Sequence, residues 1–441
     1  MRRAFSQFLD LAFPEALQFE RKHSIHNLSK GVQLVAEPFI SNYASIGILL
    51  NIGSRNDGGS PGLAYLTSQL LLSGTKSKSS TTLSSEMRSL GQFSINTTRD
   101  STWLQVLCPK ENVQKAFKLL CELIVEPALS PNVFESVKNQ VMMNCENLME
   151  DPKYLLYENV HNVAFKGHPM GNFIMGDVES IEKLTRAQVA EFVNANYTKK
   201  NTVVSAVGGV NGEEMKELCE KYLWRLPEFD KHEEFRPPAF NSVSILKDVD
   251  DDKCFLAFGY PAGSYSHPNL MNFQILSCIL QRLGVSSNAE NNFYQTATEF
   301  DGLYSSSCTL QTYSDCGLLL ILLECHYLAL QFIGAGVLRT FNRLATTLSD
   351  QELARGKNLI YSGLVQKGSL TELCQLNANQ VRTFGRKISK GEYVGKALSM
   401  NKEIFVGEMS EWVSSVYPVI AVYGKIPDPD VIEKMYQISE K

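Results

Sequence analysis

The sequence predicts an α+β fold made of two homologous domains, each a largely antiparallel β-sheet packed with α-helices. The chain has 441 residues, about two to three times the length of a typical domain, and 44% of them are hydrophobic, enough to bury sizeable cores. Its pattern repeats with a period of roughly 210 residues. Strand-like and helix-like segments also mix without the strict alternation of a parallel α/β fold.

The repeat begins in each half with a β-rich run that ends in Gly-Ser. The run covers residues 44–54 in the first half and 254–264 in the second. A helix is expected soon after each run, at Pro61 and at Pro268, because proline is favoured in the first turn of a helix. The same order of elements occurring twice indicates a duplicated chain.

The repeat closes in each half with a strand, a turn and a helix. In the first half the strand covers 202–210 and the helix 211–222. The counterparts in the second half are a strand at 418–426 and a helix at 428–436. These four segments therefore mark where each domain ends.

Local capping signals support the predicted helices. Thr185 is a favourable N-cap with Gln188 three residues later, which is the spacing of a capping box. Leu184 and Val189 flank it as a hydrophobic staple. Asn211 is expected to start the next helix in the same way.

The stretch between the two halves, residues 226–241, is rich in charge and proline, which is typical of a linker. We predict four parts of the chain: an N-terminal segment (1–30), a first domain (31–228), a linker (229–241) and a second domain (242–441).

The N-terminal segment resembles a mitochondrial targeting sequence. Arg2 and Arg3 precede apolar side chains that share one helical face, and the first acidic residue is Asp10. Because the chain as given starts at Met1, we expect this segment to be retained.

Composition excludes several classes of protein. A net charge of −5 argues against a nucleic-acid surface, which needs clustered Lys and Arg. The ten cysteines include no CxxC pair and are expected to be buried thiols. The apolar stretch 317–338 is interrupted by Glu324 and His326, so we predict a buried strand running into a helix rather than a membrane span.

The helix that follows Pro61 has two distinct faces. Leu63, Leu66 and Leu70 lie at core-facing spacings, whereas Tyr65, Ser68 and Gln69 share another face. The segment from Gly53 to Thr75 resembles the inverted zinc-motif region of the mitochondrial processing peptidases and of the core proteins of ubiquinol–cytochrome c reductase, a family of M16-type metallohydrolases. Further collinear similarities extend the resemblance over roughly 31–436, and the second half is closest to the β-type subunits.

In that family the corresponding helix carries H-x-x-E-H, in which two His bind Zn²⁺ and the Glu activates a metal-bound water. The resemblance places the two His at Tyr65 and Gln69 and the Glu at Ser68. A third ligand, a Glu, falls on Asn144, with Glu146 as the only nearby carboxylate if the register slips by two residues. We therefore expect a degenerate site without metal, cofactor or catalytic residue.

No other metal site is evident in the sequence. None of the seven histidines pairs with another at the i, i+4 spacing of a helical chelate. His161 and His326 lie in apolar surroundings, and we expect satisfied core or rim residues there.

The resemblance implies a non-catalytic structural core subunit of the core protein 1 kind in mitochondrial ubiquinol–cytochrome c reductase. Its implied partners are an α-type homologue (core protein 2), cytochrome b, cytochrome c1 and the iron–sulfur subunit. Its implied location is the matrix side of the mitochondrial inner membrane, attached peripherally through those partners.

The sequence bears on two other functions. A non-catalytic, substrate-binding subunit of the mitochondrial processing peptidase resembles an α subunit, which carries a long glycine-rich loop. The matching stretch here, 281–293, has one glycine and disfavours that alternative. An active metallopeptidase would need the missing H-x-x-E-H motif.

Overall fold

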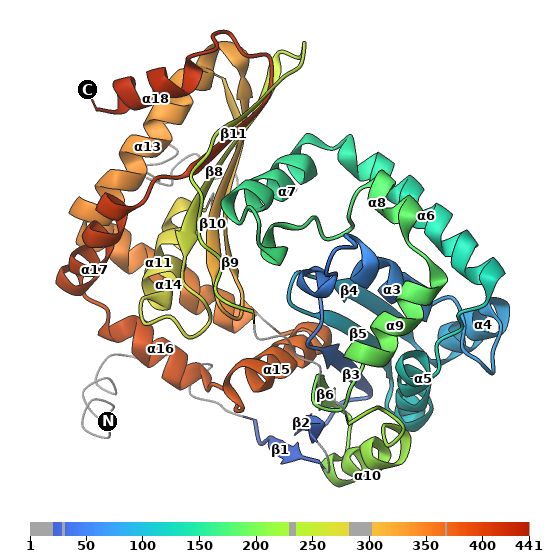
Figure 1. Ribbon diagram of the computed structural model, residues 1–441. Helices are drawn as coiled ribbons and strands as arrows, with labels where there is room; N and C mark the ends of the chain where they lie inside the picture. Colours follow the sequence, from blue (N-terminus) through green and yellow to red (C-terminus); the bar gives the residue numbers. More distant parts are fainter. Residues whose placement is uncertain (1–20, 29–30, 229–234, 282–301, 367, 441) are drawn as a thin grey trace.

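The computed structural model describes residues 21–28, 31–228, 235–281, 302–366 and 368–440. It contains two mixed sheets, each with helices of its own half on one face (Figure 1). The predicted α+β architecture of two similar domains is confirmed. The described residues leave out 1–20 and 29–30 of the predicted N-terminal segment, 229–234 of the predicted linker and most of the 281–293 stretch. The predicted domain bounds stay a prediction.

The first sheet has six strands in the order β1-β2-β6-β3-β5-β4. Only β2 and β6 pair in parallel; the other neighbours are antiparallel. The strands are β1 (Ser24–Asn27), β2 (Gln33–Pro38), β3 (Tyr43–Leu50), β4 (Gln92–Thr97), β5 (Thr102–Pro109) and β6 (Thr202–Gly208). The two edge strands are β1 and β4.

One face of this sheet carries the helices of the first half, with a large apolar core between them. These helices are α3 (Leu63–Leu71), α4 (Ser80–Leu90), α5 (Val113–Val125), α6 (Pro131–Met149), α8 (Val178–Lys183), α9 (Arg186–Asn196) and α10 (Gly212–Tyr222). A further helix of this half, α7 (Pro152–Ala164), lies elsewhere.

The second sheet has five strands in the order β7-β11-β8-β10-β9. The strands are β7 (Ile245–Asp248), β8 (Lys253–Ala262), β9 (Leu303–Thr312), β10 (Gly317–His326) and β11 (Val419–Gly424). The helices are α11 (Leu270–Leu280), α13 (Leu330–Thr347), α14 (Asp350–Gln366), α15 (Leu370–Phe384), α16 (Lys390–Ser399), α17 (Lys402–Ser415) and α18 (Val431–Ser439).

The internal repeat is confirmed element by element. The two Gly-Ser runs contain β3 and β8, and the helices that follow are α3 and α11. Both helices begin two residues later than predicted: Gly62 and Asn269 are the N-caps, so Pro61 and Pro268 precede the first turn. The closing segments are β6 with α10 and β11 with α18. The prediction that residues 317–338 form a strand followed by a helix is also confirmed, since β10 leads into α13. Across the described ranges, no helix is both long and apolar enough to cross a bilayer.

Each half contributes one helix that packs against the sheet of the other half, an arrangement that the sequence did not predict. In Figure 1, green α7 lies against β8 and β11, and α15 lies against β3 and β6. Val160 of α7 comes so close to the second sheet that a Cβ at Gly259 would lie 2.5 Å from its Cγ1. On the other side, the Cys374 thiol of α15 reaches the Ser45 and Ser205 carbonyls at 3.4 and 3.3 Å.

The exchanged helices bury the second face of each sheet. Apolar residues of the first sheet, among them Val35, Leu49 and Val203, pack against Ala378 and Val381 of α15. The equivalent cluster in the second half joins α7 to strand residues of β8, β10 and β11. Neither sheet therefore has both faces covered by its own half alone.

The predicted caps are also in place. The Thr185 hydroxyl accepts from the Gln188 backbone N–H at 3.3 Å, and the Gln188 side chain accepts from the Thr185 N–H at 2.8 Å. Asn211 caps α10 by accepting from the N–H groups of Glu213 and Glu214. All ten cysteines lie in described segments, and no disulfide joins them; Cys278 and Cys316 are half-buried and the others are buried, as expected.

Candidate functional site

The start of helix α3 is fixed by a buried carboxylate. Asp57 accepts hydrogen bonds from the backbone N–H groups of Gly62 at 2.8 Å and Ala64 at 2.7 Å. Gly62 adopts φ +88°, a left-handed conformation suited to glycine. Burial raises the pKa of Asp57 to about 8, although the two N–H groups act in the opposite direction. The loop before α3 thus holds the helix in one orientation.

The two predicted faces of α3 are confirmed. Leu63, Leu66 and Leu70 are buried in the core of the first half. On the other face Tyr65 and Gln69 are half-buried, whereas Ser68 has no exposed surface.

Ser68 is occupied by its own helix. Its hydroxyl donates to the Tyr65 carbonyl at 2.7 Å and accepts from the Gln69 side-chain amide at 3.5 Å. A serine hydroxyl is neutral near pH 7 and is a far weaker proton acceptor than an ionised carboxylate. Ser68 therefore cannot take a proton from a water molecule as a carboxylate would.

Tyr65 is also held in its neutral form. Burial, and next the nearby Cys145 of α6, raise the pKa of the Tyr65 phenol. Burial likewise raises the pKa of the Cys145 thiol to about 11, helped by Asp177 and Glu146. Metal binding by either residue needs the deprotonated form, which both environments disfavour.

Asn144 lies one residue before Cys145 on α6, the helix that packs against α3. Its side-chain oxygen accepts from Gln140 at 3.0 Å, so its polar contact stays within α6. The alternative carboxylate, Glu146, is exposed. Hydrogen bonds thus connect Tyr65, Ser68 and Gln69 within α3, whereas the side-chain hydrogen bond of Asn144 is made within α6.

These four side chains supply a phenol, a hydroxyl and two amides. Zinc sites in proteins are built from imidazole, thiolate and carboxylate ligands. The donor set therefore does not fit a zinc ion. Across the ranges that the structure describes, no cluster of three or more His, Cys, Asp or Glu side chains is arranged to hold a metal.

Buried polar side chains of the first half, around Arg99 and α7, form a network that reaches Tyr313 of the second half. Arg99 has no exposed surface and donates to Glu158 of α7 at 2.8 Å and to the Met170 carbonyl at 3.1 Å. His161, also buried, lies 2.8 Å from the Tyr157 carbonyl through Nδ1 and 2.9 Å from the Tyr313 hydroxyl through Nε2.

The two hydrogen-bond partners of His161 determine which ring nitrogen carries the proton. A carbonyl can only accept, so Nδ1 carries the proton and Nε2 accepts from Tyr313. Burial, and next the charge of Arg99, lower the pKa of His161 well below its ordinary value. His161 is a satisfied core residue, as the sequence predicted. His326, also expected to be satisfied, accepts from the Leu328 N–H at 3.3 Å.

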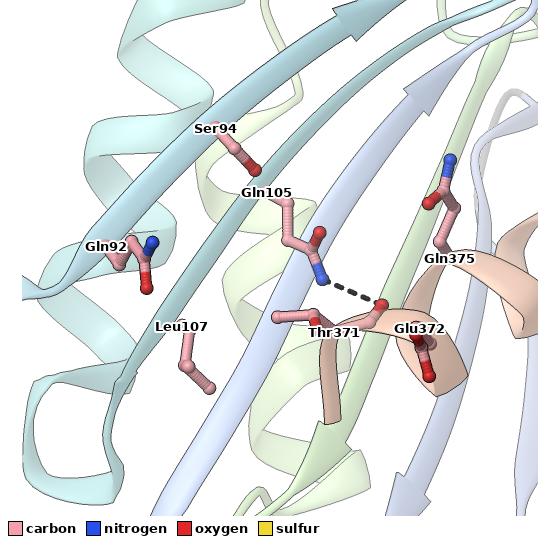
Figure 2. A pocket seen from close by; sticks show the side chains of 7 residues that line it. All are labelled: Gln92, Ser94, Gln105, Leu107, Thr371, Glu372 and Gln375. Atoms are coloured by element: carbon pink, nitrogen blue, oxygen red, sulfur yellow. Dashed lines mark hydrogen bonds between the residues drawn. The ribbon is translucent and has the colours of Figure 1, made fainter. Parts of the chain in front are cut away.

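A groove of about 360 Å³ lies on the face of strand β4 that points away from α3 (Figure 2). Gln92 and Ser94 of β4, Gln105 and Leu107 of β5, and the first turns of α15 line it. Gln105 crosses between the halves by donating to the Thr371 carbonyl at 2.9 Å. Phe93 and Ile95 of β4 point the opposite way, into the core that contains α3. The groove and α3 therefore lie on opposite faces of the same sheet.

Comparisons with known proteins agree with this geometry. Residues 37–178 match the family described as Insulinase (Peptidase family M16). Residues 183–360 match the family described as Peptidase M16 inactive domain. Together the two matches extend over well more than half of the chain.

Curated relatives are similar over nearly the full length. The human cytochrome b-c1 complex subunit 1, mitochondrial, is 23% identical over 94% of this chain and 88% of its own. The mitochondrial-processing peptidase subunit beta of Dictyostelium discoideum is also 23% identical, over 95% of this chain and 92% of its own.

Solved structures share the fold. An M16 inactive-domain protein of Pseudomonas fluorescens matches with a TM-score of 0.82 at 17% identity, covering 92% of this chain and 98% of that one. A chain of complex III2 from Candida albicans matches with a TM-score of 0.80 at 18% identity, covering 94% and 99%. The resemblance inferred from the sequence is thus confirmed, and the chain belongs to the M16 peptidase family.

Proposed function

We propose that this chain is a non-catalytic structural subunit of mitochondrial ubiquinol–cytochrome c reductase, of the core protein 1 kind. The observation that carries the proposal is the chemistry of α3. Tyr65, Ser68 and Gln69 stand at the positions of the family's two His and its Glu, and Asn144 at that of the third ligand. None of the four can bind Zn²⁺ strongly or activate water.

The burial of Ser68 supports a structural role. An enzyme needs a reacting group that is exposed to substrate, whereas Ser68 is fully buried and hydrogen-bonded to its own helix. The similarity to cytochrome b-c1 complex subunit 1 over 94% of the chain supports the choice of complex.

In this proposal the chain pairs with an α-type homologue, core protein 2. Cytochrome b, cytochrome c1 and the iron–sulfur subunit complete the assembly. The chain is attached peripherally on the matrix side of the inner membrane through those partners.

The similarity to a mitochondrial-processing peptidase subunit beta supports the processing peptidase as the alternative complex. In that alternative the chain is a non-catalytic subunit that binds substrate for an active partner. That partner would have to carry an intact H-x-x-E-H motif.

Identification of the copurifying chains separates the two functions. The full chain is tagged at its C-terminus and purified from mitochondria in mild detergent, with an untagged preparation as control. We expect cytochromes b and c1 among the major chains. Recovery of one M16 partner with an intact zinc motif, and no cytochromes, would overturn the proposal.

A further inference from the structure

A buried ion cluster joins the two halves beside the loop that carries α3. Arg55 lies in the short helix η2 (Ser54–Asn56) of the first half. Its guanidinium contacts Asp100 of the first half at 2.7 Å. It also contacts Asp315 of the second half through both terminal nitrogens, at 3.2 and 2.8 Å.

Further hydrogen bonds tie the same residues together. The Ser314 hydroxyl accepts from Arg55 at 2.8 Å. The Ser314 backbone N–H donates to the second oxygen of Asp100, also at 2.8 Å. The turn between β9 and β10 is therefore held by both a cation and an anion of the first half.

The cluster is shielded from water. The side chains of Arg55, Asp100 and Asp315 are 6%, 5% and 16% exposed. Phe235, in the segment that connects the halves, lies with its ring 4.4 Å from the Arg55 guanidinium carbon. Shielding strengthens the attraction, and it also makes the loss of one partner costly.

Arg55 is the only cation among the three charged side chains of this cluster, and it pairs with both carboxylates. One guanidinium is shared by two carboxylates, one from each half. Without its positive charge, Asp100 and Asp315 would repel each other across the boundary between the halves. Asp315, in contrast, can be removed while the Arg55–Asp100 pair remains intact within the first half.

The cluster also holds the loop that precedes α3. The backbone N–H groups of Ser54 and Arg55 donate to the carbonyls of Thr98 and Arg99 at 3.1 Å each. A few residues later Asp57 caps α3 itself. A displacement of the second half at Asp315 would therefore pull directly on the support of α3.

We propose that Arg55 is a latch that fixes the turn between β9 and β10 to the loop preceding α3. The latch fixes the second half against the loop that positions α3. Helix α3 is then held in one orientation by both halves of the chain. The proposal is independent of the assembly to which the chain belongs.

The chain offers a matched control for the latch. Lys153 of α7 also forms an ion pair between the halves, at 2.9 Å from Glu324 of β10. Its side chain is 54% exposed, and pairs of that kind contribute little. Lys153→Ala therefore removes an ion pair between the halves without touching the shielded cluster.

Hydrogen exchange measured by mass spectrometry on the full chain tests the latch. In Asp315→Ala we expect faster exchange in two sets of peptides, those that contain Ser314 and those that contain residues 54–57. The expected increase is about tenfold to a hundredfold, because a hydrogen bond to a charged group contributes about 1.5–3 kcal/mol. Peptides from α10 should keep their rate. In Lys153→Ala both latch peptides should stay within a few-fold of the unmodified chain.

A second variant keeps the test decisive if Asp315→Ala does not fold. Arg55→Lys retains the charge but loses the planar fork that reaches both carboxylates and Ser314. The same local acceleration in this variant supports the latch. Unchanged exchange at Ser314 and at residues 54–57, or a uniform acceleration that includes α10, would overturn it. No partner or activity enters the measurement, so its outcome is separate from that of the proposed function.

Discussion

Tyr65, Ser68, Gln69 and Asn144 are uncharged at neutral pH, and a Zn²⁺ ion is held by imidazole or anionic ligands. Burial reinforces this chemistry at Tyr65, whose pKa it raises. Cys145 is a residue that the sequence did not single out. Its burial against α3 depends on how α6 is rotated, and spacing alone left the register between Asn144 and Glu146 open. The resemblance supplied the four positions, whereas their hydrogen bonds required the structure.

Restoring zinc binding should take all four changes together. We expect the chain with Tyr65→His, Ser68→Glu, Gln69→His and Asn144→Glu to bind about one zinc per chain, and the unmodified chain to bind none, because only the variant supplies three ligands and a base. Elemental analysis after dialysis measures both. The matched control keeps Asn144 and makes the other three changes, and it should hold zinc weakly. Stoichiometric zinc in the unmodified chain would contradict the assignment.

His161 gives the protein a pH dependence whose direction follows from its burial. In the fold its pKa lies well below the value of about 6.5 that it has in the unfolded chain, so the unfolded chain binds the proton first as the pH falls. The stability that His161 contributes is therefore present above about pH 6.5 and is lost below it, by up to about 1.4 kcal/mol per pH unit.

Urea unfolding at several pH values tests this expectation. His161→Gln, which can still accept from Tyr313, should show a shallower fall in stability below about pH 6.5 than the unmodified chain. His23→Gln, at an exposed position, serves as the control and should keep the original slope. Equal slopes in all three proteins would show that His161 does not titrate as described.

At the scale of single elements, local sequence signals proved sufficient. Strand and helix positions of both repeats followed from hydrophobic patterning, and the Thr185 cap formed as its spacing predicts. The exchange of α7 and α15 could not be foreseen from such signals. An amphipathic pattern shows that a helix buries one face, but it does not say which sheet covers that face. Val160 meets Gly259 from the other half of the chain, and only the three-dimensional arrangement brings them together.

The capping box of α9 should contribute measurably to stability. Thr185→Ala removes the hydroxyl that accepts from the Gln188 N–H, and we expect the free energy of unfolding to fall by about 1 kcal/mol. Thr185→Ser keeps the hydroxyl and should retain most of that stability. Urea denaturation compares the three proteins. A loss in the Ser variant as large as in the Ala variant would mean that the cap is not the cause.

For the molecule as a whole, the exchanged helices imply one cooperative unit. Unfolding either half would expose an apolar sheet face that the other half covers. Two tryptophans report on the two halves: Trp103 beside α15, and Trp412 packed against Phe273 and Phe341. We expect both halves to unfold in a single transition.

Variants that keep one of these tryptophans separate the halves. With Trp224→Phe and Trp412→Phe only Trp103 reports, and with Trp224→Phe and Trp103→Phe only Trp412 does. In each variant the fluorescence midpoint in urea should coincide with the midpoint from circular dichroism. A fluorescence transition that precedes the loss of secondary structure in either variant would indicate halves that unfold separately.

A native gel tests whether the chain supports a respiratory complex without performing chemistry of its own. Mitochondrial membranes are solubilised in mild detergent, separated by mass and probed for the chain and for cytochromes b and c1. We predict that the chain comigrates with both cytochromes in one large species. A soluble species of about 100 kDa, roughly two chains of this size and without either cytochrome, would contradict it.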